Sequence, residues 1–210
     1  MSGYSLEINS INKTFGRRLI FDNLNFDLTD DGIFGIAGAN GSGKSTLVKI
    51  IAGIISPSSG KVIHKNSGKE IIPEKLHDYI GFVSPYLVMY EEFSALENLK
   101  IFSSIRCLQF NEKRSNYLFD HFNLSDRKND LVKTYSSGMK QRLKFIFALI
   151  HEPELIILDE PTSNLDEAGK DAVYQIVKKE SKKKIYIIAS NEKTDLALCE
   201  NKIVLEDFKK

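Results

Sequence analysis

The sequence predicts an α/β protein built around a parallel sheet, and two patterns support this. In the second half, short apolar segments typical of buried strands alternate with segments of helical periodicity. In the first half, short apolar segments alternate with polar turns, which is typical of antiparallel strands. The chain has 210 residues, of which 42% are hydrophobic and 27% charged. This composition excludes a disordered or fibrous chain, and we expect residues 1–210 to form a single domain.

The elements follow in order along the chain. Antiparallel strands are expected at residues 6–8 and 24–28. An apolar strand at 33–37 stops at a glycine-rich loop, and a helix follows at 47–52 until Gly53 and Pro57 end it. Two further strands are expected at 61–64 and 79–83.

Between about residues 87 and 135 the pattern becomes helical. Apolar side chains recur there at helical spacing, which predicts a small helical lobe inserted into the α/β frame; they are Leu96, Leu99, Ile101, Phe102, Ile105, Leu118 and Phe122. Beyond this lobe, helices at 137–150, 167–179 and 193–198 alternate with strands at 155–158, 185–189 and 202–205. Such alternation favours a parallel sheet covered on both faces.

The net charge and the cysteines of the chain indicate the cellular compartment and the classes of partner to expect. With 29 basic and 28 acidic residues the net charge is +1, so the chain has no overall attraction to nucleic acid or anionic lipid, and no nucleic-acid partner is expected. No apolar stretch is long enough to span a bilayer, and no secretory signal is visible. Cys107 and Cys199 are expected to be reduced, partly buried thiols in a cytoplasmic protein. No regulatory domain is expected after residue 205.

A phosphate-binding motif lies between the strand at 33–37 and the helix after it. Residues 38–46 match G-x-x-x-x-G-K-[ST] in full and in the expected context. Glycines let backbone amides approach phosphate oxygens, and the helix N-terminus adds its positive end. The lysine supplies a point charge to the β- and γ-phosphates, and Ser45 is a predicted Mg²⁺ ligand. The residues predicted to hold the nucleotide here are Gly38, Asn40, Gly41, Ser42, Gly43, Lys44, Ser45 and Thr46. A glycine-rich turn with a chance lysine is the alternative.

An acid pair, Asp159 and Glu160, follows the apolar strand at 155–158. Asp159 can reach a metal ion directly or through water. Glu160 can polarise or deprotonate the water that attacks the γ-phosphate. Two acids after a strand are usually an exposed strand end, but beside the phosphate loop they complete a metal–nucleotide site.

Two further segments connect these motifs to a known family. Residues 135–142, Tyr-Ser-Ser-Gly-Met-Lys-Gln-Arg, resemble the LSGGQ signature of the ATP-binding cassette (ABC) family, and residues 161–166 resemble its D-loop. The motifs occur in the family's order and cover the chain from about residue 6 to 205. The resemblance implies a P-loop NTPase with a RecA-like core, an antiparallel β-subdomain and an inserted helical subdomain at about 87–135.

The resemblance also implies how ATP and Mg²⁺ are held. Two such domains face each other head to tail, and each ATP lies between the phosphate loop of one and the signature segment of the other. That segment consists of Ser136, Ser137, Gly138 and Met139. Asp166 of the D-loop is a further predicted nucleotide contact. Phe15 stands where the family stacks an aromatic ring on adenine, although it is equally suited to be an ordinary strand residue. A lone protomer is expected to hydrolyse ATP poorly.

The sequence departs from the family at three places. Pro85 stands where the family has a glutamine that contacts Mg²⁺, and Asn191 stands where it has the switch histidine. Ser137 and Met139 replace a glycine and a glutamine of the signature. Asparagine can hydrogen-bond a γ-phosphate but cannot carry a positive charge. Slow hydrolysis is therefore expected, with Glu160, Lys44 and Asn191 as catalytic residues.

The resemblance implies the ATP-hydrolysing subunit of a transporter. Its partners would be an integral-membrane permease and a second nucleotide-binding domain, identical or not. The chain would lie at the inner face of the cell membrane. Its compactness is similar to that of the haem exporter ATPase of cytochrome c maturation. A P-loop kinase acting on a soluble substrate would need neither the signature nor the D-loop. A non-transport member of the family, acting as an ATPase or an interaction module, stays open.

Overall fold

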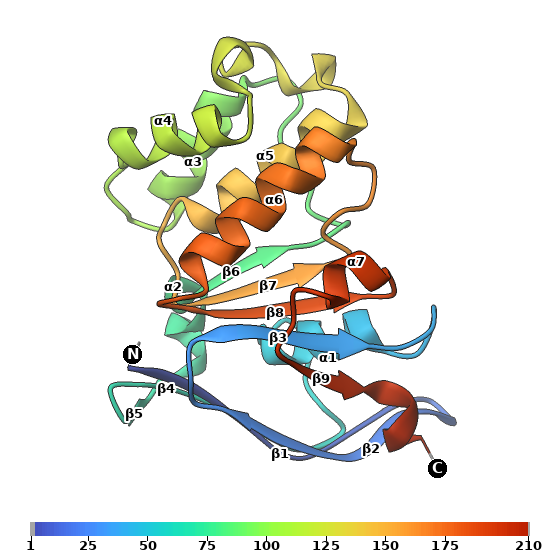
Figure 1. The fold of residues 1–210 in the computed structure, drawn as a ribbon. Coiled ribbons are helices and arrows are strands. Elements are labelled where there is room, and N and C mark those ends of the chain that lie inside the picture. The colour runs from blue at the N-terminus through green and yellow to red at the C-terminus, as the bar shows by residue number, and fades with distance from the viewer. Residues whose placement is uncertain (1–2, 210) are drawn as a thin grey trace.

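The computed structural model describes residues 3–209, so positions 1, 2 and 210 of the predicted domain lie outside the described residues. Two sheets form the frame: an antiparallel sheet with the order β2-β1-β4-β5 and a parallel sheet with the order β6-β7-β8-β3-β9. Figure 1 shows helix α1 between the two sheets and helices α5 and α6 over the opposite face of the parallel sheet. The predicted α/β class is confirmed.

The antiparallel sheet forms from the segments that alternate in hydrophobicity. Tyr4, Leu6 and Ile8 point into the core, and the residues between them are partly exposed. The predicted strands fall inside observed ones. Strand β5 was not expected, because two residues are too few to show any period. The strands are β1 (Tyr4–Phe15), β2 (Arg18–Leu28), β4 (Ser59–Asn66) and β5 (Lys69–Glu70).

The parallel sheet brings together the apolar runs of the first and second halves of the chain. Its strands are β3 (Gly32–Ala37), β6 (Ile80–Val83), β7 (Leu155–Asp159), β8 (Ile185–Ser190) and β9 (Asn201–Val204). Every residue of β7 and β8 is buried, as expected for strands covered on both faces. The register pairs Ala37 with Ser190 and Asp159 with Ala189, so the carboxyl ends of β3, β7 and β8 lie together at one end of the sheet. Ligands of open α/β sheets bind at this end of the strands.

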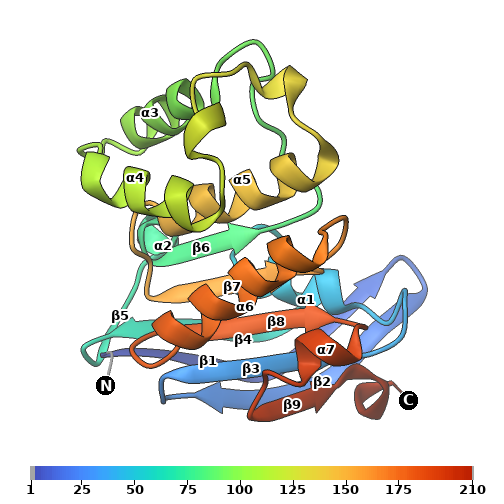
Figure 2. The ribbon, with the colours of Figure 1, turned by 45° about the horizontal axis from the view of Figure 1, so that its top comes forward.

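The helices surround the parallel sheet on both faces. Figure 2 shows α3 and α4 lying over α5, away from the sheet. Helix α2 was not expected, because a single turn gives no periodic signal. The helices are α1 (Lys44–Ile51), α2 (Leu76–Tyr79), α3 (Ala95–Ile105), α4 (Glu112–His121), α5 (Ser137–Leu149), α6 (Glu167–Glu180) and α7 (Lys193–Leu196).

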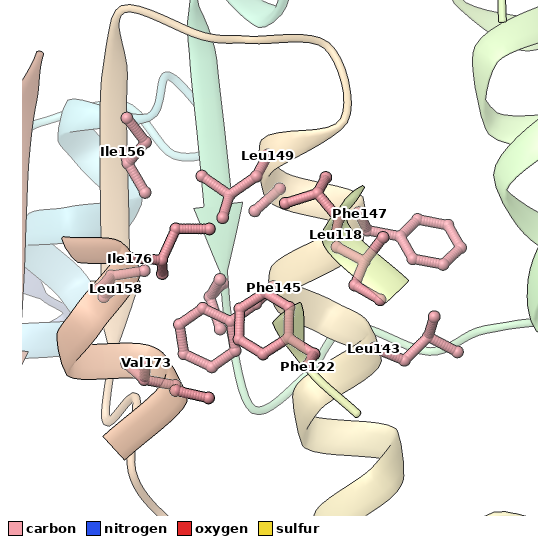
Figure 3. Packing of buried hydrophobic residues seen from close by; sticks show 14 of the residues in the cluster. Leu118, Phe122, Leu143, Phe145, Phe147, Leu149, Ile156, Leu158, Val173 and Ile176 are labelled. Carbon is pink, nitrogen blue, oxygen red and sulfur yellow. The ribbon is translucent and has the colours of Figure 1, made fainter. Parts of the chain in front are cut away.

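Two hydrophobic cores lie on either side of the parallel sheet. One joins the sheet, α5, α6 and α4; in Figure 3 Val173 and Ile176 of α6 lie beside Ile156 and Leu158 of β7. The other joins the sheet to α1 and the antiparallel sheet. The phosphate loop enters α1, so it rests on the second core.

Cys107 is exposed, which corrects the expectation that both thiols are partly buried. It follows the end of α3 with a φ of 54°, where the chain turns away from the helix. Cys199 is buried, and burial raises the pKa of its thiol to about 11. Within residues 3–209 no helix is both long and apolar enough to cross a membrane.

Candidate nucleotide-binding site

A cavity of about 490 Å³ opens where the phosphate loop meets the ends of the strands. Eight of the predicted site residues line it: Phe15, Asn40, Gly41, Gly43, Lys44, Ser45, Thr46 and Glu160. Pro85, which the resemblance places at the family's glutamine position, also lines it, and so do three residues that no motif indicated, namely Arg18, Ile20 and Tyr86. The cavity is thus lined by the phosphate loop, by a buried lysine and by a carboxylate.

Gly43 sets the turn that leads from the phosphate loop into α1. Its φ of 111° lies in the left-handed region, and a Cβ at this position would lie 2.5 Å from Cγ2 of Ile20. Only glycine fits both constraints. The helix therefore begins with free backbone amides that face the cavity, which suits an anion.

The ammonium group of Lys44 is held inside the loop. Its Nζ donates to the carbonyl oxygens of Gly38 at 2.9 Å and Ala39 at 3.3 Å. It also lies 3.5 Å from Oε1 of Glu160, and the lysine side chain is 5% exposed. A largely buried charge with weak carbonyl partners is prepared to bind a stronger anion such as a phosphate.

Ser45 and Asp159 form the candidate metal site. The Ser45 hydroxyl donates to Oδ1 of Asp159 at 3.0 Å. Oδ2 of this buried carboxylate is without a hydrogen-bond partner among the described residues, and burial raises its pKa. A bound cation would compensate both costs. Residues 3–209 contain no cluster of three or more His, Cys, Asp or Glu residues for a metal, so a cation at this place would need further oxygen ligands from outside the chain. Such a partial set of oxygen ligands fits Mg²⁺.

Glu160 is fixed by its backbone as well as by its side chain. Its φ of 48° is unusual for a residue with a side chain, and its N–H donates to the carbonyl of Ala189 at 2.8 Å. Oε2 lies 3.3 Å from the hydroxyl of Ser190. A strained conformation that neighbours hold in place is typical of functional sites.

The buried carboxylate of Asp195, in α7, accepts hydrogen bonds from residues close to the acid pair. It accepts hydrogen bonds from Thr162 Oγ1 at 3.0 Å, from Ser190 Oγ at 2.8 Å and from the Tyr174 hydroxyl at 2.7 Å. Thr162 follows the acid pair, and Ser190 ends the neighbouring strand. The network therefore fixes the positions of Glu160 and of the chain before Asn191. No motif indicated Asp195.

Asn191 reaches the phosphate loop directly. Its Nδ2 donates to Oδ1 of Asn40 at 3.0 Å, although 151 positions separate the two residues. Two predicted site residues therefore meet at the rim, although Asn191 is not among the residues that line the cavity.

Comparison with known proteins identifies the family. The family model described as ABC transporter matches residues 21–163. The chain belongs to the ABC transporter family. It is 34% identical over 172 residues to the lantibiotic transport ATP-binding protein SrtF of Streptococcus pyogenes, an alignment that covers 82% of this chain and 73% of that protein.

Other relatives are longer than this chain. It is 33% identical to the linearmycin resistance ATP-binding protein LnrL of Bacillus subtilis, with 82% of this chain and 56% of LnrL covered. An uncharacterized ABC transporter ATP-binding protein of Bacillus subtilis, YdbJ, is 35% identical, and the match covers 78% of this chain and 53% of YdbJ. The chain therefore spans little more than half the length of these two relatives.

The solved structures with similar folds are ABC cassettes. An ATP-binding subunit of an ABC transporter superimposes with a TM-score of 0.81 at 24% identity, covering 95% of this chain and 85% of that one. A dimeric bacterial ABC transporter cassette gives 0.83 at 23% identity, with 95% and 93% covered. The fold is that of the ABC cassette, a P-loop NTPase.

The signature segment lies outside the cavity. Ser136 is the N-cap of α5, where its hydroxyl accepts the N–H of Met139 at 3.2 Å. The helix is anchored through Gln141, whose Nε2 donates to the carbonyl of Pro161 at 3.0 Å. Asp166 is likewise the N-cap of α6 and accepts the N–H of Gly169 at 2.9 Å. Neither Asp166 nor any residue of the signature segment lines the cavity.

Pro85 and Tyr86 form part of the cavity wall, at the position where the resemblance predicts the family's glutamine. Lys144 Nζ donates to the Pro85 carbonyl at 2.9 Å, and Lys49 Nζ lies 4.3 Å from the centre of the Tyr86 ring. The loop is therefore held from α5 and from α1. The loop places the aromatic ring of Tyr86 at this wall. Proline has neither a side-chain amide nor a backbone N–H.

Proposed function

We propose that this chain is the ATP-hydrolysing subunit of an ABC transporter. The observation that carries the proposal is the convergence of Lys44, Ser45 and Glu160 on one cavity, with Asp159 behind Ser45. The relatives named for linearmycin resistance and for lantibiotic transport support it.

The residues of the chain have separate roles in binding and hydrolysing ATP. Amides of the phosphate loop bind the phosphate oxygens, and Lys44 exchanges its carbonyl partners for the β- and γ-phosphates. Ser45 and Asp159 would hold Mg²⁺, which would neutralise charge on the phosphates. Glu160 lies beside this space and accepts a proton from the attacking water. Phe15, which is 53% exposed, supplies a ring for the adenine.

Hydrolysis is proposed to be real but slow. Glu160 and Lys44 are present, whereas Pro85 and Asn191 replace the two usual groups that sense the γ-phosphate. Steady-state phosphate release from the wild type should exceed that of Glu160→Gln clearly. Glu167→Gln serves as the control, because its side chain is 87% exposed and lies on α6 away from the cavity. Wild-type turnover no greater than that of Glu160→Gln would contradict the proposal.

A second copy of this chain is proposed to complete each site. The signature segment and the acid pair occur in the same chain, so a head-to-tail homodimer would contain two complete sites. The N-terminus of α5, capped by Ser136, then supplies amides to the nucleotide held by the other copy.

The proposed membrane partner is a permease that inserts a helix into an apolar groove of about 370 Å³. The groove lies between β6 and the helices α3 and α5. It is lined by Ile54, Phe82, Leu87, Phe102 and Phe147 among others. An amphipathic helix suits such a surface. Through it the chain would lie at the inner face of the cell membrane.

Co-purification from detergent-solubilised membranes tests this partner. The tagged chain should retain a multi-span membrane protein, and Ile54→Asp should lose it, because Ile54 is 57% exposed at the groove. Ile72→Asp is the matched control, because Ile72 is 54% exposed and does not line the groove. If no membrane protein is retained, or if both variants behave alike, this partner is wrong and the non-transport alternative gains support.

A further inference from the structure

The last turn of the described chain lies against the phosphate loop. The 3₁₀ turn Leu205–Phe208 follows β9 directly. Leu205 is completely buried, and Phe208 packs partly buried against the core that also contains α1. These two apolar anchors hold Glu206, one of the two residues between them, in a defined place although its own side chain is exposed.

Glu206 makes a charge-assisted hydrogen bond to the loop. Its Oε1 accepts the backbone N–H of Ala39 at 2.7 Å, across a separation of 167 positions. This bond and one from its own backbone hold the pKa of the carboxyl below its ordinary value, and the nearby charges of Lys209 and Lys44 act in the same direction. The group is therefore an anion at neutral pH.

The peptide that Glu206 holds also contacts Lys44. Its N–H is that of Ala39 and its carbonyl is that of Gly38, which accepts the ammonium group of Lys44 at 2.9 Å. The next carbonyl along the chain, that of Ala39, accepts the N–H of Ser42 at 3.0 Å and the same ammonium group at 3.3 Å. Gly38 allows the close approach, because a Cβ there would lie 3.0 Å from Oε2 of Glu206 and 2.5 Å from Oγ of Ser42. A change at Glu206 is thus transmitted through one peptide to Lys44.

We propose that Glu206 is a positioning residue of the nucleotide site, which fixes the first peptide of the phosphate loop in the conformation that receives a triphosphate. The proposal rests on the proposed binding of ATP by this loop. Glu206 does not line the cavity, so it acts on affinity through the loop and leaves the chemical step at Glu160 unchanged.

Four variants of the full chain test this role by titration with Mg·ATP and by steady-state kinetics. For Glu206→Ala we expect a Kd and KM about tenfold or more above the wild type, because a charge-assisted hydrogen bond is lost. Its kcat should stay within about twofold of the wild type, since the reacting groups are untouched. Glu206→Gln keeps an acceptor oxygen and should recover most of the affinity. Asp207→Ala is the matched control, as its exposed neighbour, and should bind as the wild type does.

Lys44→Ala, the fourth variant, separates the two proposals. If Lys44→Ala loses binding but Glu206→Ala binds Mg·ATP as tightly as the wild type or more tightly, the positioning role alone is overturned. Tighter binding by Glu206→Ala would show that the carboxylate repels phosphate. No binding by the wild type overturns the proposed function as well. Melting temperatures check that Glu206→Ala is folded, and Glu206→Gln keeps the test valid if it is not.

Discussion

The phosphate loop and the signature segment both begin helices, yet only the phosphate loop lines the cavity that also contains Glu160. The phosphate loop leads into α1 between the two sheets, and Lys44, Ser45 and Glu160 converge on its cavity. The signature segment begins α5, and its hydrogen bond from Met139 to Ser136 is that of an ordinary cap. Under the proposed function, one chain contains two half-sites that do not meet within it. Binding of ATP should be a property of the single chain, whereas hydrolysis should need a second copy.

The largest effect is expected from a charge placed in the signature segment. Ser137→Glu sets a carboxylate in the first turn of α5, where the helix dipole favours it, so the fold should be retained. The same charge would repel the phosphates held by the facing copy. In a Glu160→Gln background, we expect ATP-dependent dimerisation to disappear while Mg·ATP binding to the monomer stays within about twofold, because the phosphate loop is untouched. Light scattering measures the mass.

Ser137→Ala is the control for this variant and should still dimerise. A Ser137→Glu chain that dimerises as the unmodified chain does would show that the signature segment does not face a nucleotide.

The next effect concerns the C-terminal end of α1, the helix that follows the phosphate loop. His64 is buried; its Nε2 donates to the carbonyl of Ile51, at the end of α1, at 2.9 Å, and Nδ1 accepts from the Tyr4 hydroxyl. Burial lowers the pKa of His64 to about 4, whereas an unfolded histidine titrates near 6.5. Its stabilising contribution is therefore complete above about pH 6.5 and is lost as the pH falls toward 4.

Denaturant unfolding at pH 7.5 and pH 5 measures this loss, which should be about 2 kcal/mol for His64. His64→Gln should reduce the pH dependence by that amount. His64→Gln should not abolish the pH dependence of stability, because burial lowers the pKa of His151 to about 3 in the other core. An unchanged pH dependence in His64→Gln would mean that His64 is not held neutral.

The smallest effect is expected at the adenine end of the cavity. Phe15→Ala should weaken Mg·ATP binding about fivefold, since ring stacking contributes about 0.5–1.5 kcal/mol, and Phe15→Tyr should restore it. Competition between ATP and a fluorescent nucleotide measures the change. Equal affinity in all three chains would make Phe15 an ordinary strand residue, which the sequence left open.

The sequence was most informative where the chemistry is local. The phosphate loop and the acid pair are contiguous motifs at the ends of apolar strands, and β7 and β8 are continuous apolar runs because both of their faces are buried. The parallel register then brings the two motifs to one edge of the sheet, as the alternation of strands and helices implied.

Contacts between distant segments could not be predicted in this way. Asp195 and Glu206 belong to short elements with no periodic signal, and their partners, Thr162 and Ala39, lie far away in the sequence. Tyr86 lines the cavity because Lys49 and Lys144 position its loop, a relation that no spacing reveals. The roles of Asn191, Asp166 and the signature segment stay predictions.

Titration of Mg·ATP into the purified chain, with Lys44→Ala in parallel, tests the central claim most directly. We expect saturable binding of one nucleotide per wild-type chain. For Lys44→Ala we expect binding weaker by about a hundredfold, because the substitution removes a largely buried positive charge that would face the phosphates. No binding by either protein, or equal binding by both, would contradict the assignment of this loop as the nucleotide site.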